Sequence, residues 1–223
     1  MKSFTKLEKI SLIKKVPYWW HAIDLGDNIV TPGFTAPWVH KLLSSAIPKN
    51  LKGKTVLDIG AWDGYYSFEC EKRGAKVTAI DNYQNRKGRK GFNTAKRIIG
   101  SKVKYRQMDL FDLPEWKKKF DVIIFFGVLY HVKHPLKALE IIFSKTKKLL
   151  ILESHYIKRP ANIPIMRFYP GKELSNDPTN WWGPNIMCII DMLKVVGFKK
   201  IKLFATYLNK KERGRVIIKA YKK

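Results

Sequence analysis

The sequence has little of three things: cysteine, acidic residues and long apolar runs. Its two cysteines, Cys70 and Cys188, are far apart among 223 residues, so they form neither a metal-binding nor a redox spacing. No apolar run approaches the ~20 residues that cross a bilayer. The basic N-terminal stretch also lacks the uninterrupted apolar core of a signal peptide. We therefore expect reduced thiols, no metal site, no membrane segment and a cytoplasmic location.

The shortage of acidic residues leaves a large positive charge. Lys and Arg total 44 against 18 Asp and Glu, a formal net charge of +26. Such a surplus favours polyanionic partners, with nucleic acid first among them. A lysine-rich genome would produce the same surplus without a partner, and 35 of the basic residues are Lys. The composition therefore leaves both interpretations open.

The stretch 55–69, TVLDIGAWDGYYSFE, organises the rest of the chain. A short apolar run, a turn with Gly60 and Gly64, and a helical pattern predict the first half of a parallel βαβ unit. A dinucleotide fold would need further glycines where Trp62 and Tyr65 stand, so a nicotinamide dehydrogenase is disfavoured. The spacing of Asp58, Gly60 and Gly64 instead resembles motif I of the class I S-adenosylmethionine (SAM) methyltransferases, with Trp62 in place of the usual middle glycine.

Strand and helix patterns alternate regularly after this motif. Strands are expected at 56–59, 76–80, 103–107, 120–127, 149–153, 198–206 and 214–221, with a turn at Gly214 that makes the last two antiparallel. Helices are expected to end at Gly74, Gly100 and Gly197, because glycine favours the left-handed conformation that follows a helix. We therefore predict an α/β fold with a doubly wound, seven-stranded, Rossmann-like sheet and an antiparallel C-terminal strand.

We predict one catalytic domain over residues 51–223, preceded by an arm and an aromatic cover segment over residues 1–50. The arm either lies over the catalytic face or is solvated, with its apolar residues as a docking face: Phe4, Leu7, Ile10, Leu12 and Ile13. The aromatic group that follows is favoured as core or cover over a base-stacking site: Tyr18, Trp19, Trp20 and Trp38. Segment 155–183, rich in proline and aromatic residues, is predicted to be a lid-like insertion.

Acidic residues follow two further strands, where they could bind a nucleoside. Asp81 ends the second strand 23 residues after Asp58, the place where an acid hydrogen-bonds a ribose diol in doubly wound folds. The alternative is that Asp81 only begins a turn. Asp109, beside Leu110, follows the third strand and is the expected adenine contact, as in other SAM enzymes, with Asp112 as the second choice.

The unbroken apolar run 120–126 predicts a central parallel strand. It places Gly127, Tyr130 and His131 at the carboxyl edge of the sheet, where ligands bind in this architecture. A neutral imidazole can take a proton from an acceptor hydroxyl, and a phenol can hydrogen-bond a ligand. The alternative is that His131 only caps the loop.

Three motifs, FFGVLYHVKHPLKAL, VLDIGAWDGYYSFE and ILESHY, make the chain resemble the tRNA wobble-uridine (5-methoxyuridine and 5-oxyacetic acid) methyltransferase-like family over about residues 13–221. The resemblance implies transfer of a methyl or carboxymethyl group to the 5-hydroxyl of a uridine at tRNA position 34. The chain has only a short remnant of the N-terminal region of the longer members. Trp62 and NDPTNWWGPN look more like shorter relatives, whose acceptors include sugars or small metabolites.

The resemblance also bears on the donor. Carboxymethylating members use carboxy-SAM and hold its additional carboxylate with a Lys, a Tyr and an Arg, which match Lys15, Tyr130 and Arg215, with Arg213 as the alternative. We favour SAM over carboxy-SAM, because the match at Lys15 and at the arginine is loose. Two other functions stay open: methylation of a small hydroxylated metabolite or glycan, and a non-catalytic RNA-binding Rossmann domain. A homo-oligomer is neither predicted nor excluded.

Overall fold

The computed structural model describes residues 4–82, 86–160, 162–210 and 212–223. The chain forms two compact units, residues 1–109 and residues 110–223. Across the described ranges, no helix is both long and apolar enough to cross a bilayer. The seven main strands are divided between the two units, three in the first and four in the second.

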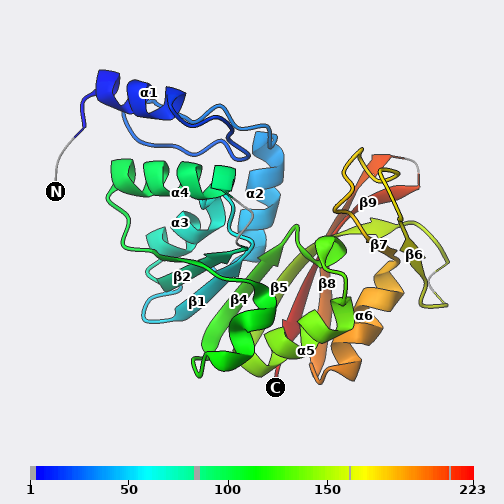
Figure 1. The fold of residues 1–223 in the computed structure, drawn as a ribbon. Coiled ribbons are helices and arrows are strands. Elements are labelled where there is room, and N and C mark those ends of the chain that lie inside the picture. The colour runs from blue at the N-terminus through cyan, green and yellow to red at the C-terminus, as the bar shows by residue number, and fades with distance from the viewer. Residues whose placement is uncertain (1–3, 83–85, 161, 211) are drawn as a thin grey trace. The chain divides into compact units, whose positions relative to one another are not determined.

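The first unit contains three parallel strands in the order β3-β2-β1, and Figure 1 shows β1 and β2 side by side. They are β1 (Thr55–Ile59), β2 (Lys76–Asp81) and β3 (Lys104–Gln107), and the helices are α1 (Lys6–Lys14), α2 (Pro37–Ala46), α3 (Tyr65–Lys72) and α4 (Arg86–Ile99). Val56, Leu57 and Ile80 are fully buried, as expected of parallel strands covered on both faces. The carboxyl ends of the three strands meet at one edge, which carries the motif I turn, Asp81 and the residues after β3.

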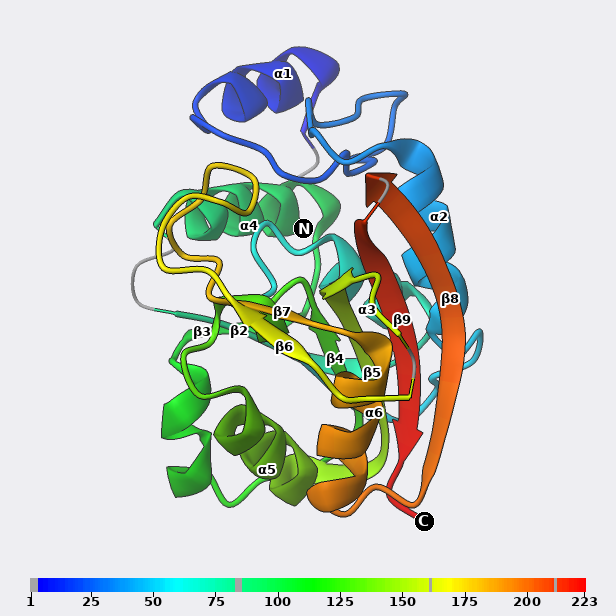
Figure 2. The same ribbon diagram turned by 90° about the vertical axis from the view of Figure 1, so that its right-hand side faces the viewer.

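The N-terminal segment is folded onto the first unit. A capping box between Thr5 and Glu8 begins α1, and this helix contacts α4 (Figures 1 and 2). The predicted docking face is wrong in part, because Leu7 is 80% exposed and Ile10 is 40% exposed. Of the aromatic group, Trp19 is buried in the core, whereas Trp20 remains half-exposed.

The second unit contains four strands in the order β4-β5-β9-β8. They are β4 (Phe120–Phe126), β5 (Thr146–Ile157), β8 (Lys200–Lys210) and β9 (Arg213–Tyr221), and Figure 2 shows β8 and β9 side by side. β4 and β5 are parallel, whereas β9 is antiparallel to both of its neighbours. The helices are η1 (Leu110–Glu115), η2 (Leu129–His131), α5 (Pro135–Lys145) and α6 (Ile186–Val195). The predicted mixed α/β sheet with an antiparallel C-terminal strand is therefore confirmed.

Several strands and turns have other boundaries in the structure than the sequence predicts. The predicted turn at Gly214 is wrong: Gly214 lies inside β9, opposite Tyr156 and Leu208, because cross-strand pairing continues past the charged residues that suggested a turn. β5 extends to Ile157, and segment 155–183 also contains β6 (Met166–Phe168), which pairs with β7 (Trp182–Pro184).

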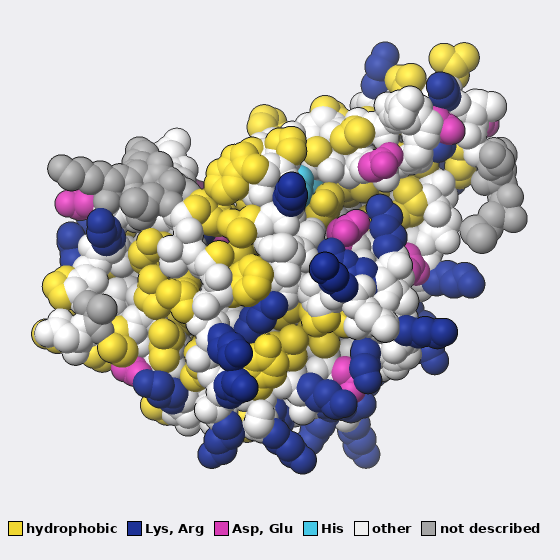
Figure 3. Space-filling model, turned by 180° about the vertical axis from the view of Figure 1, so that it is seen from behind, with side chains coloured by type: hydrophobic (Ala, Val, Ile, Leu, Met, Phe, Trp, Pro, Cys, Tyr) yellow, Lys and Arg dark blue, Asp and Glu magenta, His cyan; other side chains and the backbone are white. Residues whose placement is uncertain are grey.

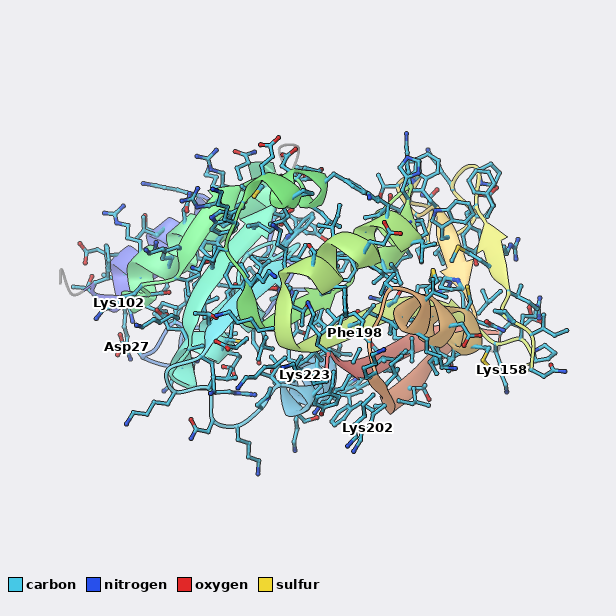
Figure 4. The ribbon with its side chains drawn as sticks, turned by 90° about the horizontal axis from the view of Figure 1, so that it is seen from below. Asp27, Lys102, Lys158, Phe198, Lys202 and Lys223 are labelled. Atoms are coloured by element: carbon cyan, nitrogen blue, oxygen red, sulfur yellow. The ribbon has the colours of Figure 1, made fainter. Side chains whose placement is uncertain are left out.

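Asn185 caps α6, its side chain accepting the backbone N–H of Cys188 at 2.9 Å. The chain then leaves this helix through Gly197, and β8 begins later than expected. Phe198, labelled in Figure 4, instead packs against Phe143 of α5 with ring centroids 5.1 Å apart.

Candidate active site

The first candidate cluster is the turn between β1 and α3 in the first unit. Gly60 has φ +75° and donates its N–H to the carbonyl of Ile80 at 3.0 Å. Gly64 has φ +94°, and an added Cβ would lie 2.6 Å from the ring of Phe92. Glycine is therefore required at Gly64 for both conformation and space. The turn is held against β2 and presents its backbone at the carboxyl edge.

Trp62 stands in this turn in a conformation that bulky residues rarely adopt, with φ +49°. Its backbone N–H donates to Oδ2 of Asp81 at 2.8 Å. Its ring contacts Trp20 and Tyr18, with centroids 5.9 and 6.2 Å apart. The indole Nε1 is buried and has no hydrogen-bond partner within the part of the chain that the structure describes. A buried donor of this kind is available to an acceptor atom of a ligand.

Asp58 lies beneath the turn and is 3% exposed. Ser67 donates its hydroxyl to Oδ2 of Asp58 at 2.6 Å. Burial raises the pKa of the Asp58 carboxyl to about 6, because desolvation disfavours the charged form. A neighbouring cation would reverse this shift. The ammonium group of SAM is such a cation.

Asp81 and Asp109 occupy the next two positions along the same edge. Oδ1 of Asp81 accepts the N–H of Asn82 at 2.9 Å, and Oδ2 accepts the N–H of Trp62 at 2.8 Å. The carbonyl of Asp81 accepts the N–H of Met108 at 2.8 Å, which fixes Asp109 just beyond β3. The first unit therefore brings Asp58, Asp81 and Asp109 to one edge, an arrangement that fits SAM.

Asp63 was not predicted, although it lies inside the motif. It is fully buried and accepts the backbone N–H groups of Trp20 and His21 at 2.8 and 3.0 Å. The imidazole Nδ1 of His21 also bonds to its Oδ1. Asp63 thus ties the N-terminal segment to the donor turn. The acid next to Gly64 was the only sequence signal, and nothing local identified its partner 42 residues away.

A second candidate cluster lies in the second unit, on one face of three strands. The register places Arg215 of β9 opposite His155 of β5 and Tyr207 of β8. Arg215 donates to both carboxylate oxygens of Glu153, through Nε at 2.5 Å and Nη2 at 2.7 Å. The Glu153 side chain is 2% exposed and that of Arg215 is 19% exposed. This bidentate pair, which the sequence did not predict, fixes the guanidinium.

Gly127 and Tyr130 complete this cluster at the end of β4. The Tyr130 hydroxyl and Nη2 of Arg215 would each lie 3.7 Å from a Cβ added at Gly127, so both converge on its Cα. The Arg215 guanidinium carbon lies 4.8 Å from the centroid of the Tyr130 ring. Burial raises the pKa of the Tyr130 phenol, which therefore stays protonated. The cluster presents a phenol and a guanidinium to any ligand atom beside Gly127.

His131 adjoins this cluster and has a defined tautomer. Its Nδ1 lies 3.1 Å from the carbonyl oxygen of Thr179 and 3.0 Å from Oγ1 of the same residue. Because a carbonyl only accepts, Nδ1 carries the hydrogen. Burial lowers the pKa of His131, so the ring is neutral and its lone pair is on Nε2. His131 can therefore accept a proton, which is the predicted role.

The remaining predicted site residues, Lys15, Leu110 and Arg213, contribute less to the two clusters described above. Lys15 is exposed and caps the C-terminal end of α1. Leu110 is buried at the start of η1. Arg213 pairs with Ile157, two positions along β5 from His155, whereas Arg215 contacts Tyr130. Among the residues that the structure describes, no three His, Cys, Asp or Glu side chains form a metal-binding group.

Known proteins with related sequences cover most of the chain. A family model described as a methyltransferase domain matches residues 32–188. A tRNA U34 carboxymethyltransferase of Campylobacter jejuni subsp. doylei is 31% identical over 207 residues, which cover 92% of this chain and 69% of that protein. The chain belongs to this methyltransferase family. The predicted resemblance is thereby confirmed, and SAM is the donor class.

Other relatives are longer than this methyltransferase. The chain covers 52% of a tRNA U34 carboxymethyltransferase of Campylobacter jejuni subsp. jejuni at 31% identity. It covers 54% of the protein of that name from Aliarcobacter butzleri at 28% identity. The chain therefore spans about half the length of these two relatives.

Solved structures show the same fold. The N-terminal domain of EvdMO1, crystallised with SAH and D-fucose, has a TM-score of 0.77 at 14% identity and covers 98% of this chain and 97% of that domain. A SAM-dependent methyltransferase from Archaeoglobus fulgidus has a TM-score of 0.59 at 17% identity and covers 82% and 93% of the two chains. At such identities the likeness shows the fold alone.

Proposed function

We propose that this methyltransferase transfers a methyl group from SAM to the 5-hydroxyl of a wobble uridine in tRNA. The observation that carries the proposal is the cluster at the end of β4. A protonated phenol and a fixed guanidinium converge there at Gly127, beside a neutral histidine with a free Nε2. The names of the related proteins support the acceptor. The net charge of +26 suits a polyanion.

The residues of the first unit are assigned to the donor. When bound, SAM supplies a methyl group on a positively charged sulfur. Asp58 would hold the ammonium end, because its buried carboxylate needs a cation. Asp81 would accept the ribose hydroxyls, and Asp109 would contact the adenine. The backbone of the glycine turn allows close approach, and Nε1 of Trp62 supplies a buried donor.

The residues of the second unit are assigned to transfer. His131 removes the proton of the acceptor hydroxyl through Nε2, which makes the oxygen a better nucleophile. A positioned base of this kind contributes typically ~10²–10⁴-fold. Tyr130 and Arg215 hydrogen-bond the acceptor and hold its oxygen in place. Segment 155–183 contributes Thr179, which orients His131, and we propose that this segment covers the acceptor.

Carboxy-SAM is the second candidate donor, favoured by the names of the related proteins and by the Tyr130–Arg215 contact. The ion pair between Glu153 and Arg215 argues against carboxy-SAM as the donor. The carboxylate of Glu153 already neutralises Arg215 and occupies two of its N–H groups. A second carboxylate would gain less from this guanidinium and would bring one more buried negative charge. We therefore propose SAM as the donor.

The acceptor is tested with tRNA that carries 5-hydroxyuridine at position 34. We expect incorporation of methyl-labelled SAM into that nucleoside, identified by mass spectrometry, and loss of incorporation in His131→Gln. Binding of bulk tRNA should weaken steeply with salt, because phosphate contacts release counterions. Figure 3 shows Lys and Arg side chains spread over much of one face, with fewer Asp and Glu. Absence of label in tRNA together with flat salt dependence would contradict the acceptor and point to a small hydroxylated metabolite.

The donor is tested by competition between SAM and carboxy-SAM in calorimetric titrations. The wild type should prefer SAM. Lys15→Ala and Arg215→Ala are compared with it under the same conditions. A wild-type preference for carboxy-SAM that both substitutions abolish would overturn the choice of SAM.

A further inference from the structure

Three aromatic side chains gather in the segment between β5 and α6, at residues to which no role has been assigned above. We call Phe168, Trp181 and Trp182 the aromatic platform. The planes of Phe168 and Trp181 are 11° from parallel, with centroids 6.4 Å apart. Phe168 and Trp182 have centroids 5.1 Å apart. Phe168 is 51% exposed, and both tryptophans are partly exposed. The platform therefore offers aromatic faces to a ligand.

A cationic side chain accompanies the aromatic platform. The ammonium of Lys133 lies 5.0 Å from the Trp181 ring centroid, whereas the guanidinium of Arg167 lies over the ring of Tyr169, 4.9 Å from its centroid. The nearby acids are engaged in local turns. Asp177 accepts the N–H and hydroxyl of Thr179 at 2.8 and 2.7 Å, and Glu173 accepts the N–H of Gly171 at 2.9 Å. The surface thus combines ring faces with positive charge.

Hydrogen bonds fix the aromatic platform to the residues around His131. The backbone N–H of Trp181 donates to the carbonyl of Tyr130 at 2.9 Å. The indole N–H of Trp182 donates to the carbonyl of Lys133 at 3.2 Å. Because β7 also contacts η2 and β5, the platform is positioned relative to the proposed catalytic base. A ligand on the platform would therefore be held next to the segment that carries His131.

The chemistry of this surface selects one class of ligand. A purely apolar partner would gain nothing from the ammonium of Lys133. Unpaired nucleobases gain from both features, since bases stack on aromatic rings and cations attract the phosphates between them. We propose that the aromatic platform stacks the unpaired bases that flank the target uridine in a single-stranded RNA loop. This inference rests on the proposed function, because it assumes an RNA acceptor.

The test measures binding of the full chain to a fluorescent RNA hairpin with an unpaired loop and to a duplex without one. Phe168→Leu and Trp181→Leu remove the aromatic faces. Phe204→Leu is the matched control: Phe204 on β8 is 38% exposed and has the ammonium of Lys219 4.2 Å from its ring centroid. We expect each platform variant to bind the hairpin about 10-fold more weakly. The control and all duplex affinities should change less than about twofold.

Thermal unfolding and SAM titration show whether each variant is folded. Unchanged hairpin affinity in folded platform variants would overturn the inference, and so would an equal loss in Phe204→Leu or on the duplex. A wild-type enzyme that methylates tRNA while Phe168→Leu keeps its KM for tRNA would refute the platform alone. A wild type that binds the hairpin through the platform but leaves tRNA unmethylated would refute the proposed acceptor alone.

Discussion

Replacing Arg215 by Met tests the buried ion pair in the candidate cluster of the second unit. The substitution keeps much of the side-chain volume but removes both hydrogen bonds to Glu153, whose side chain is 2% exposed. Removing one partner of a buried pair leaves an uncompensated charge and costs about 3–5 kcal/mol. For a protein of this size, that corresponds to a fall in Tm of roughly 6–20 °C. Calorimetric thermal unfolding at pH 7.5 measures it.

Two controls separate this charge effect from lost packing. The double variant Glu153→Gln/Arg215→Met has no buried charge and should recover most of the lost Tm. Arg159→Met interrupts an exposed pair with Glu212, 3.8 Å apart, and should leave Tm nearly unchanged. The reasoning fails if Arg215→Met unfolds within about 2 °C of wild type, or if the double variant is as unstable as the single one.

Three further substitutions test the proposed roles. Asp58→Asn should abolish SAM binding in calorimetry. It should also raise the Tm of the ligand-free protein above pH 6, because a pKa raised to about 6 means that the ionised Asp58 destabilises the folded state there. A Tm of the variant below that of the wild type at pH 8 would contradict this. His131→Gln should lower kcat by about 10²–10⁴-fold and leave SAM affinity unchanged. The wild type should stay active below pH 6.5, since burial lowers the pKa of His131. If the variant and the wild type are equally active at pH 7.5, His131 is not the base. Trp62→Phe keeps a ring but removes the buried Nε1 donor, so SAM should bind about 10-fold more weakly; unchanged affinity would show that this donor does not meet the ligand.

Local patterns in the sequence were enough to predict the turn and the strand edge of the first unit, to which we assign donor binding. Glycines at 60 and 64, between an apolar run and a helical pattern, identify the turn because few residues tolerate its conformation. Asp81 and Asp109 follow parallel strands, whose carboxyl ends meet at one edge. The same rule placed Tyr130 and His131 after β4. These inferences need only periodicity and chain order, which sequence displays directly.

Only the tertiary structure decided the partners of these residues. Glu153 and Arg215 are 62 positions apart, and they meet because the register of β5 and β9 places them diagonally on one face. A shift of one residue would turn Arg215 to the other face of the sheet. The sequence left Arg213 and Arg215 as alternatives, since both lie on the same face of a strand. The register of β5 and β9 and the position of the turn before β9 depend on backbone pairing between residues far apart in the sequence. The charged residues and the glycine near position 214 do not indicate that pairing.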